Sequence, residues 1–271
     1  MAFEDADYWN TVAEVWNVTQ PQPLWRKHSD IVNQQLLACW LPSGRVSRLL
    51  KTDAFDEAYS SGLYAFLTSR AEQVVDIDIA TSVLAAAKAR CPYLPAVGAD
   101  VRHLPFADRA FDVVVSNSTL DHFDTPQDII QSLRELRRVL RDGGHLVVTL
   151  DNLANPIIAL RNILPFRLLH CIGVVPYYVG VSCVPSRLQQ IVQEAGFEVL
   201  AMNAVLHCPR VLAIPIMRLL EKYAPAWLQQ WFLAVLFACE RLTALPTRFL
   251  TGHFIAVKAT AGAGVTTLVS V

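Results

Sequence analysis

The sequence predicts an α/β protein with a doubly wound, mostly parallel sheet. Apolar runs of strand length alternate with helical segments in the order β-α-β-α-β-β-α-β over residues 45–150. Most of these runs are apolar on both faces, which is typical of parallel strands covered by helices on both sides. Two runs end at Asp78 and Asp100, and a third ends at Asn117. Because ligands of open α/β sheets bind outside the carboxyl ends of the strands, these residues predict one small-molecule site.

The composition limits the class of protein. The chain has 271 residues, of which 53% are hydrophobic and 17% charged, and its formal net charge is −1. This length suits one large domain or a domain with insertions, and the missing basic excess argues against nucleic acid as a partner. Six scattered cysteines without a CxxC pair argue against a disulfide scaffold, and no metal site is predicted.

The distribution of apolar residues indicates a cytoplasmic protein. The acidic first ten residues lack the apolar core of a signal peptide. The longest apolar run, residues 231–239, is far shorter than the ~20 residues that a membrane-spanning helix needs. Peripheral contact of this run with a membrane surface stays open.

The first half of the chain predicts a lid followed by the start of the sheet. Residues 1–30 hold three tryptophans among polar residues and prolines, and we expect a lid or cap there. The α/β domain is expected over residues 31–260. Asp53 and Asp56 resemble a capping box, which predicts a helix up to about Thr68. The other expected elements are a helix at 31–41, strands at 45–50, 73–77, 96–98 and 110–116, and a helix at 82–89.

The second half predicts the rest of the sheet and two insertions. Thr125 is a good N-cap and Pro126 suits the first helical position, so a helix is expected from there to about Arg141, before Gly143 and Gly144. Apolar, proline-containing insertions are expected at about 153–184 and 209–246, the second with two helices broken at Pro225. The remaining expectations are strands at 145–150, 197–202 and 253–258, a helix at 187–195, and a flexible tail at 261–271.

The residues around the predicted strand ends resemble a known family. The stretch VVDID, followed by GADVRHLPFADRAFDVVVSNSTLDHF from Gly98 to Phe123, is similar to class I S-adenosylmethionine-dependent methyltransferases, and in particular to methyltransferase type 11-like domains. The resemblance covers residues 31–150 well, and 187–197 and the last strand more loosely. It implies a Rossmann-like fold with a seven-stranded sheet and S-adenosylmethionine as the cofactor.

The resemblance also implies which residues bind the cofactor. Asp78, with Ile79 beside it, would accept the ribose hydroxyls, although a carboxylate here also serves nicotinamide enzymes or simply caps a helix. Asp100 would hold the adenine amino group, and the backbone N–H of Val101 a ring nitrogen. The segment at Ser116 and Asn117 would lie beside the methionine part of the cofactor.

The same comparison suggests candidates for a catalytic base. His122 follows the fourth strand and has an ordinary pKa near 6.5, which suits proton transfer at neutral pH. Asp121 and Tyr177 are the other candidates. The alternative for His122 is packing or covering the cofactor, because a histidine acts as a base only beside a placed proton donor.

The loop after the first strand departs from the family pattern. The family has a glycine-rich loop there, whereas this chain reads RLLKTDAFDEAYSSG, with no glycine between Gly44 and Gly62. Lys51, Thr52 and Asp53 are expected to contact the cofactor instead, with Lys51 on its carboxylate and Asp53 on its ammonium group. The alternative is that the acids only cap a helix. An acidic helix start repels pyrophosphate, which argues against a dinucleotide.

The apolar insertions suggest the acceptor. We expect methyl transfer to a hydrophobic small molecule or a lipid-linked acceptor, with the segments 176–178 and 207–210 lining its pocket. A stripe of Trp227, Trp231 and Phe232 favours a membrane contact or a homodimer face. Two alternatives stay open: a non-catalytic methyltransferase-like protein that binds a lipid or protein partner, and a nicotinamide dehydrogenase, which the missing GxGxxG disfavours.

Overall fold

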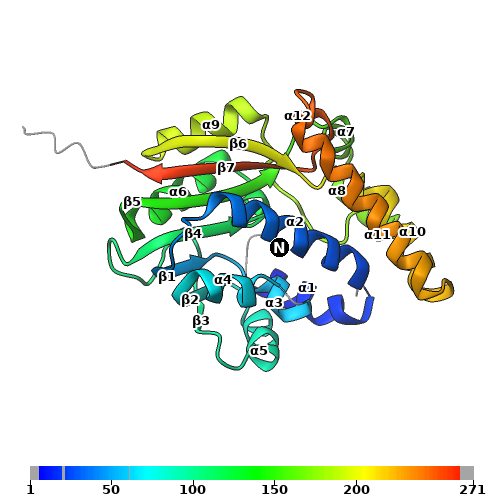
Figure 1. Cartoon of the computed structure of the whole chain (residues 1–271), viewed down its shortest axis with the longest axis horizontal. Coiled ribbons are helices and arrows are strands. Elements are labelled where there is room, and N and C mark those ends of the chain that lie inside the picture. The colour runs from blue at the N-terminus through cyan, green and yellow to red at the C-terminus, as the bar shows by residue number, and fades with distance from the viewer. Residues whose placement is uncertain (1–5, 20–21, 61, 263–271) are drawn as a thin grey trace, which may run out of the picture.

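The centre of the molecule is a seven-stranded sheet with the strand order β3-β2-β1-β4-β5-β7-β6 (Figure 1). The computed structural model describes residues 6–19, 22–60 and 62–262. Neighbouring strands from β3 to β5 are parallel, and β7 runs antiparallel to both β5 and β6. The strands are β1 (Val46–Lys51), β2 (Ala71–Asp78), β3 (Ala96–Gly98), β4 (Phe111–Asn117), β5 (Leu140–Asp151), β6 (Phe197–Val205) and β7 (Phe254–Ala261). This sheet confirms the predicted fold class.

Helices cover both faces of the sheet because the strands are apolar on both. The α-helices are α1 (Ala6–Thr19), α2 (Pro23–Trp40), α3 (Phe55–Tyr59), α4 (Tyr64–Arg70), α5 (Thr81–Arg90), α6 (Pro126–Val139), α7 (Pro156–Ile163), α8 (Phe166–Cys171), α9 (Pro185–Glu194), α10 (Arg210–Tyr223), α11 (Ala226–Cys239) and α12 (Arg248–Thr251), with 3₁₀ turns η1 (Leu120–His122) and η2 (Glu240–Ala244). In β1, Leu50 belongs to the core under α6 and α9, whereas Leu49 belongs to the core under α2, α4, α10 and α11. This alternation is the period of two that a strand imposes.

Most predicted elements are present with small shifts of their ends. β3 has the predicted bounds, and Thr125 caps α6 as expected, because its Oγ1 accepts a hydrogen bond from the N–H of Asp128 at 3.3 Å. That helix ends at Val139, two residues before the predicted end. The helix expected at 31–41 is α2, which already begins at Pro23 and therefore crosses the predicted boundary between lid and domain without a break.

The single helix predicted from the capping box to Thr68 is wrong. The chain instead forms two short helices, α3 and α4, and residue Ala54 is the N-cap of α3 without a side-chain hydrogen bond. Asp53 Oδ1 accepts only the N–H of Phe55, two residues on. The helix breaks near Gly62, whose φ of +59° lies in the left-handed region that favours glycine.

The two predicted insertions carry helices on one side of the molecule. The first holds α7 and α8, and the second holds α10 and α11, separated at Pro225 as expected. These helices lie together at the right of Figure 1. Within the described residues, no helix has both the length and the apolar character needed to cross a membrane. Most of the predicted tail, from residue 263 on, lies outside the described residues.

Candidate cofactor and acceptor site

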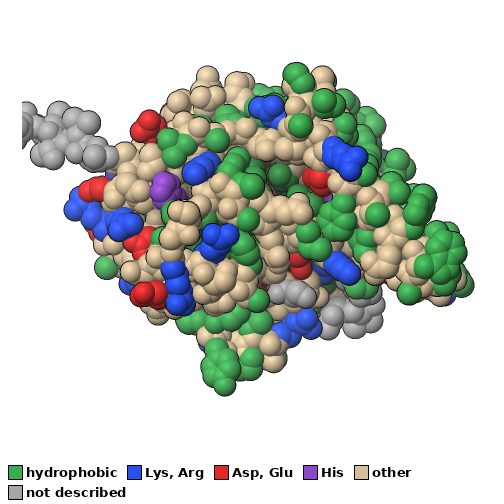
Figure 2. All heavy atoms as spheres, viewed as in Figure 1, with side chains coloured by type: hydrophobic (Ala, Val, Ile, Leu, Met, Phe, Trp, Pro, Cys, Tyr) green, Lys and Arg blue, Asp and Glu red, His purple; other side chains and the backbone are tan. Residues whose placement is uncertain are grey.

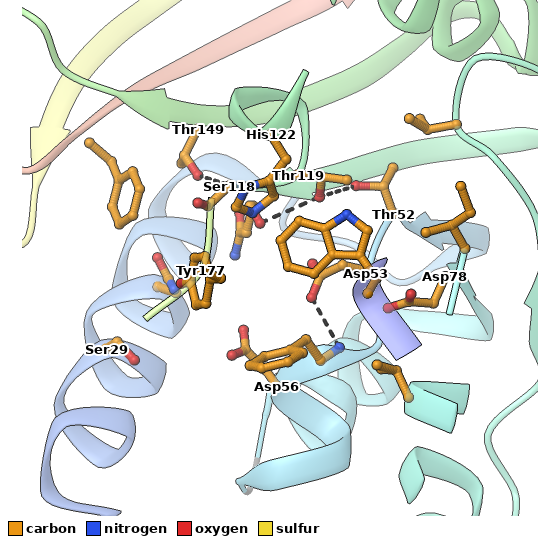
Figure 3. A pocket seen from close by; sticks show the side chains of 18 of the residues that line it. Ser29, Thr52, Asp53, Asp56, Asp78, Ser118, Thr119, His122, Thr149 and Tyr177 are labelled. Carbon is orange, nitrogen blue, oxygen red and sulfur yellow. Dashed lines mark hydrogen bonds between the residues drawn. The ribbon is translucent and has the colours of Figure 1, made fainter. Parts of the chain in front are cut away.

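A cavity of about 190 Å³ lies at the carboxyl ends of the parallel strands (Figure 3). The segments after β1, β2, β3 and β4 line its floor, and α1, α2 and the segment before α9 cover it. β1 lies at the point where the strand order reverses, between β2 and β4, which is the place where open α/β sheets bind ligands. The sequence-predicted residues that line this cavity are Thr52, Asp53, Asp78, Ile79, Asp100, Val101, Asn117, His122 and Tyr177.

Asp78 connects the end of β2 to the loop after β1. Its Oδ1 accepts the N–H of Ala80 at 2.8 Å, and its Oδ2 accepts the N–H of Ala54 at 3.1 Å. Burial raises the pKa of Asp78, and these two backbone hydrogen bonds work against that rise. Each carboxylate oxygen has a further lone pair, so Asp78 can still accept hydrogen bonds from the hydroxyls of a ligand.

Asp53 is an acid whose charge changes near neutral pH. Burial raises its pKa to about 7, while the nearby Lys51 ammonium group opposes the rise. Its Oδ2 accepts no hydrogen bond from the described residues and lies 3.4 Å from Lys51 Nζ. In Figure 3, Asp53, Asp56 and Asp78 lie on one side of the cavity. This acidic side suits a positively charged ligand.

Lys51 lies beneath the cavity instead of in it, which corrects the sequence prediction. Its side chain is fully buried, and its Nζ is 2.7 Å from Glu57 Oε2 and also donates to the carbonyl oxygen of Asp53. Burial lowers the pKa of Lys51, but the charges of Asp53 and Glu57 outweigh this effect and raise it well above its ordinary value. Because the ammonium group is neutralised inside the protein, Lys51 is no longer a candidate for direct contact with the cofactor.

Arg26 is a cation that does line the cavity, and the sequence reasoning missed it. Its guanidinium group lies 3.3 Å from Asp56 Oδ1 and stacks over the rings of Trp16 and Phe55, at 5.4 and 5.1 Å from their centres. Its Nε has no hydrogen-bond acceptor among the described residues. No residue pattern around Arg26 indicates this role, because its position depends on how α2 packs over the sheet.

Asp100 is already held by a neighbouring arginine. The guanidinium group of Arg102 donates to both carboxylate oxygens, with distances of 2.8–3.1 Å, and the N–H of Arg102 donates to Oδ1 at 2.8 Å. Burial works to raise the pKa of Asp100, but the hydrogen bonds and charge of Arg102 outweigh it and lower the pKa. Asp100 therefore stays ionised and fixed in orientation, ready to accept a hydrogen bond from a ligand.

The opposite wall holds amide and hydroxyl groups at the end of β4. Asn117 lines the cavity and is 8% exposed, yet neither its Oδ1 nor its Nδ2 has a hydrogen-bond partner among the described residues. A buried amide without partners is costly, so this group is suited to a polar ligand. Ser116, in contrast, is fully buried outside the cavity lining, where its hydroxyl accepts a hydrogen bond from Thr52 at 2.9 Å.

His122 faces the cavity in a defined neutral form. Its Nδ1 lies 3.1 Å from the carbonyl oxygen of Tyr178; because a carbonyl only accepts, Nδ1 carries the hydrogen and Nε2 keeps its lone pair. Burial lowers the pKa of His122 to about 4. Asp121 does not line the cavity, and it accepts a hydrogen bond from the Ser118 hydroxyl at 2.8 Å. At neutral pH, His122 is therefore an uncharged and weak base.

Aromatic rings cover the cavity. Trp9 on α1 lies 4.6 Å from His122 and 5.8 Å from Tyr177, ring centre to ring centre, and Trp16 lies 5.5 Å from Tyr177. These contacts place aromatic ring surface over His122 and Tyr177. The tryptophans of the predicted lid are the sequence signal for this cover, but the sequence does not show which rings would face the cavity.

A second cavity of about 180 Å³ adjoins the first, and both are lined by Gln22, Tyr177 and Arg210. Of the residues predicted to line an acceptor pocket, Pro176, Tyr177, Cys208, Pro209 and Arg210 do so. Tyr178 and His207 line neither cavity, which corrects that part of the expectation. The ring of His207 is instead bound between the hydroxyl groups of Thr243 and Thr251, at 2.8 Å from each.

The first cavity fits S-adenosylmethionine in its chemistry. The sulfonium and ammonium groups of that molecule suit the acidic side, and its polar methionine end suits the unpartnered amide of Asn117. Ile79, Val101 and Phe123 supply apolar surface beside Asp100 for a flat base. The glycine-free loop does not remove this fit, because Lys51 lies below the cavity and the loop places Thr52, Asp53, Phe55 and Asp56 in its lining.

Comparisons with known proteins point to methyltransferases. A family model described as a methyltransferase domain matches residues 57–148. A demethylmenaquinone methyltransferase of Chlamydia trachomatis serovar L2 is 27% identical over 157 residues, which cover 56% of this chain and 66% of that relative. The match thus spans slightly less than two thirds of the relative's length.

Two solved structures share the fold. A putative sarcosine dimethylglycine methyltransferase from Galdieria sulphuraria has a TM-score of 0.56 and 13% identity, covering 88% of this chain and 86% of that one. Phospholethanolamine N-methyltransferase 2 of Haemonchus contortus, in complex with phosphomonomethylethanolamine and S-adenosylhomocysteine, has a TM-score of 0.55 and 17% identity, covering 85% and 53%. Sheet order and family match agree, and residues 57–148 carry a methyltransferase domain of the class I S-adenosylmethionine-dependent type.

Proposed function

We propose that this protein transfers a methyl group from S-adenosylmethionine to a hydrophobic small-molecule or lipid-linked acceptor. The observation that carries the proposal is the pair of adjoining cavities. The first is lined by acids at the carboxyl ends of the strands, and the second is lined mainly by apolar side chains from α7, α10 and residues 172–179. Tyr177 and Arg210 line both, so an acceptor in the second cavity would meet a cofactor in the first.

Several residues would hold the cofactor in this proposal. Asp78 would accept hydrogen bonds from the ribose hydroxyls and Asp100 one from the adenine amino group. Asp53 and Asn117 would receive the ammonium group, and Arg26 would take the role of pairing with the carboxylate that the sequence suggested for Lys51. Their positions in one cavity support these assignments.

The chain would contribute positioning and a dry site. S-adenosylmethionine supplies an electrophilic methyl group when it is bound. The aromatic cover of Trp9, Trp16 and Tyr177 would exclude water, and holding two reactants in line supplies much of a rate enhancement. His122 would help to position the acceptor from the cavity lining and would not serve as a strong base, because its pKa of about 4 makes it a weak base at neutral pH.

One observation favours a second candidate, a non-catalytic protein that binds a lipid or protein partner. The loop after β1 carries Phe55 into the cavity, in a region where the family has glycine residues that let the backbone approach the cofactor. If this ring blocks the cofactor, the cavities would serve binding alone.

Calorimetric titration with S-adenosylmethionine and S-adenosylhomocysteine separates the two candidates. Micromolar binding by the wild type, weakened about 10-fold or more in Asp78→Asn and in Asn117→Ala, is expected, because each variant loses a hydrogen bond to the ligand or the charge that strengthens it. Glu198→Gln, an exposed change on the edge strand β6, is the control and should bind normally. No binding by folded wild-type protein would favour the non-catalytic candidate, and normal binding by both variants would refute the assigned contacts.

A further inference from the structure

The lining of the second cavity contains more basic than acidic side chains. Among its lining residues, Arg161, Arg210 and Arg218 are basic, and no aspartate or glutamate is present. Asp151, buried behind the lining, pairs with Arg161, whose Nη1 lies 2.6 Å from Asp151 Oδ2, and its charge also acts on Arg210 without an ion pair. His253 also lines the cavity, but burial lowers its pKa to about 4, so it is neutral at physiological pH. Three arginines therefore face one nearby acid, and the lining keeps an excess of positive charge.

Arg210 and Arg218 are arranged to bind an anion. The guanidinium group of Arg210 is half-buried over the rings of Trp25 and Tyr177, at 5.7 and 6.0 Å from their centres. Neither arginine donates a hydrogen bond to any described residue, and neither forms an ion pair within the described chain. Both are on α10, about 12 Å apart along the helix axis. A partly buried guanidinium group without acceptors has strong capacity for a phosphate or carboxylate.

The rest of the cavity is apolar and continues onto an apolar surface. Ile157, Ile172, Val174 and Val211 line the cavity while 37%, 62%, 40% and 39% of each remains exposed. Exposed apolar residues on α7, α8 and α10 extend this surface: Leu160, Ile163, Leu168, Leu212, Ile216 and Leu219. Figure 2 shows hydrophobic side chains gathered along the right edge, where Figure 1 places α7, α8, α10 and α11. A ligand that covers this surface has an apolar chain.

The two cavities thus differ in electrostatic character. The first is lined by four aspartates, Asp53, Asp56, Asp78 and Asp100, against two arginines, Arg26 and Arg210, whereas the charged groups in the lining of the second are all basic. We propose that the second cavity binds an anionic amphiphile, with its phosphate or carboxylate headgroup on Arg210 and Arg218 and its apolar chain along α7, α8 and α10. That this amphiphile is the methyl acceptor rests on the proposed function; its binding does not.

Dodecyl phosphate below its critical micelle concentration is the probe that tests this proposal, with binding followed by calorimetry. We expect it to bind at least 10-fold more tightly than dodecyl maltoside, which has the same chain and no charge, and more tightly than inorganic phosphate. Equal binding of the charged and the neutral amphiphile would overturn the anion site. Equal binding of inorganic phosphate and dodecyl phosphate would overturn the role of the apolar surface.

Variants locate the headgroup. Arg210→Gln/Arg218→Gln should weaken dodecyl phosphate binding by 10-fold or more, and the single variant Arg218→Gln, on an exposed position that does not perturb the core, should weaken it measurably. Arg134→Gln, an exposed cation on α6 that lines neither cavity, is the matched control and should bind like the wild type. Unchanged binding in Arg218→Gln together with a folded double variant that binds normally would refute the assignment.

A parallel titration with S-adenosylmethionine keeps the two proposals apart. Binding of dodecyl phosphate without binding of S-adenosylmethionine would leave the anionic site standing and refute only its role in methyl transfer. Binding of S-adenosylmethionine without binding of dodecyl phosphate would refute the amphiphile site and leave the proposed function standing.

Discussion

At the scale of single residues, one buried ion pair organises the loop that replaces the glycine-rich turn. Lys51 and Glu57 are both fully buried, and Glu57 Oε1 also accepts the backbone N–H groups of Leu63 and Tyr64 at 2.8 and 3.1 Å. Glu57 therefore satisfies the first N–H groups of α4 while it holds the end of β1. The pair fixes the loop between them, which contains the cavity residues Thr52 and Asp53.

Replacing only the cation of this pair is expected to destabilise the protein strongly. Lys51→Met should lower the free energy of unfolding by about 3–5 kcal/mol, because Glu57 would then be a buried charge without its partner. Lys51→Met/Glu57→Gln should recover much of the loss, since the glutamine carbonyl can still accept both backbone N–H groups. Urea unfolding measures both values, with Lys88→Met, an exposed change on α5, as the control. A loss below about 1 kcal/mol in the single variant would contradict a structural role for the pair.

At the scale of elements, hydrogen bonds join α1 to α5. Asn10 Oδ1 accepts the N–H and the hydroxyl hydrogen of Ser82 at 2.9 and 2.7 Å, and thereby caps the first turn of α5, which lacks a side-chain cap of its own. The Tyr59 hydroxyl group donates to the carbonyl oxygen of Ala13 at 2.9 Å. These contacts hold Trp9 and Trp16 over the cavity.

Removing this distant cap should weaken both the fold and the cover. Asn10→Ala is expected to lower the free energy of unfolding by about 1 kcal/mol, as loss of a helix cap usually does, and to weaken binding of S-adenosylhomocysteine because α1 is less firmly held. Thr11→Ala, whose hydroxyl group bonds only within α1, is the matched control. Stability and affinity equal to those of the wild type would show that this contact does not hold α1.

Elements specified by neighbouring residues were predictable, and those specified by distant residues were not. The start of α6 follows from Thr125 and Pro126, which act within one turn. The break between α3 and α4 depends on Glu57 turning toward Lys51 and toward the N–H groups of α4, so the local capping pattern around Asp53 was misleading. No pattern within α5 shows that its cap is Asn10.

The candidate site was predictable to the same extent. The positions of Asp78, Asp100 and Asn117 at one end of the sheet follow from strand polarity and topology alone. The burial of Lys51 does not, because it depends on which neighbouring charge attracts the ammonium group. The role of Arg26 depends on how α2 crosses the sheet, which no local pattern encodes.

At the scale of the whole molecule, the balance of buried acids sets how stability depends on pH. Burial raises the pKa of Asp30 and Asp53 to about 7 and that of Asp121 to about 8. In the unfolded chain these carboxyl groups titrate near 3.9, so between that value and pH 7–8 the folded protein holds protons that the unfolded chain has released. Stability therefore falls as pH rises through this window. His122 and His253 act in the opposite direction, but only between about pH 4 and 6.5.

The protein is accordingly expected to lose stability between pH 6.5 and 8.5. The acids dominate in this range, because the opposing contribution of the histidines fades above pH 6.5, and the free energy of unfolding should fall by roughly 2–4 kcal/mol. Urea unfolding at pH 6.5, 7.5 and 8.5 measures the change, and Asp121→Asn should reduce the slope because it removes the acid with the highest of these three pKa values. A free energy that is constant or rises over this range would contradict the raised pKa values.

The position of β7 has a consequence for how the chain folds during synthesis. β7 is inserted between β5 and β6 and pairs with both, so that His145 is opposite Thr260, far along the chain. A nascent chain that ends before residue 254 has β6 without β7, its one neighbour among the described strands, and β5 with one open edge. Pairings of such high contact order form late and leave strand edges exposed to aggregation meanwhile. Emergence of β7 from the ribosome, and not the pairing of the parallel strands from β3 to β5, thus determines when the molecule completes its sheet.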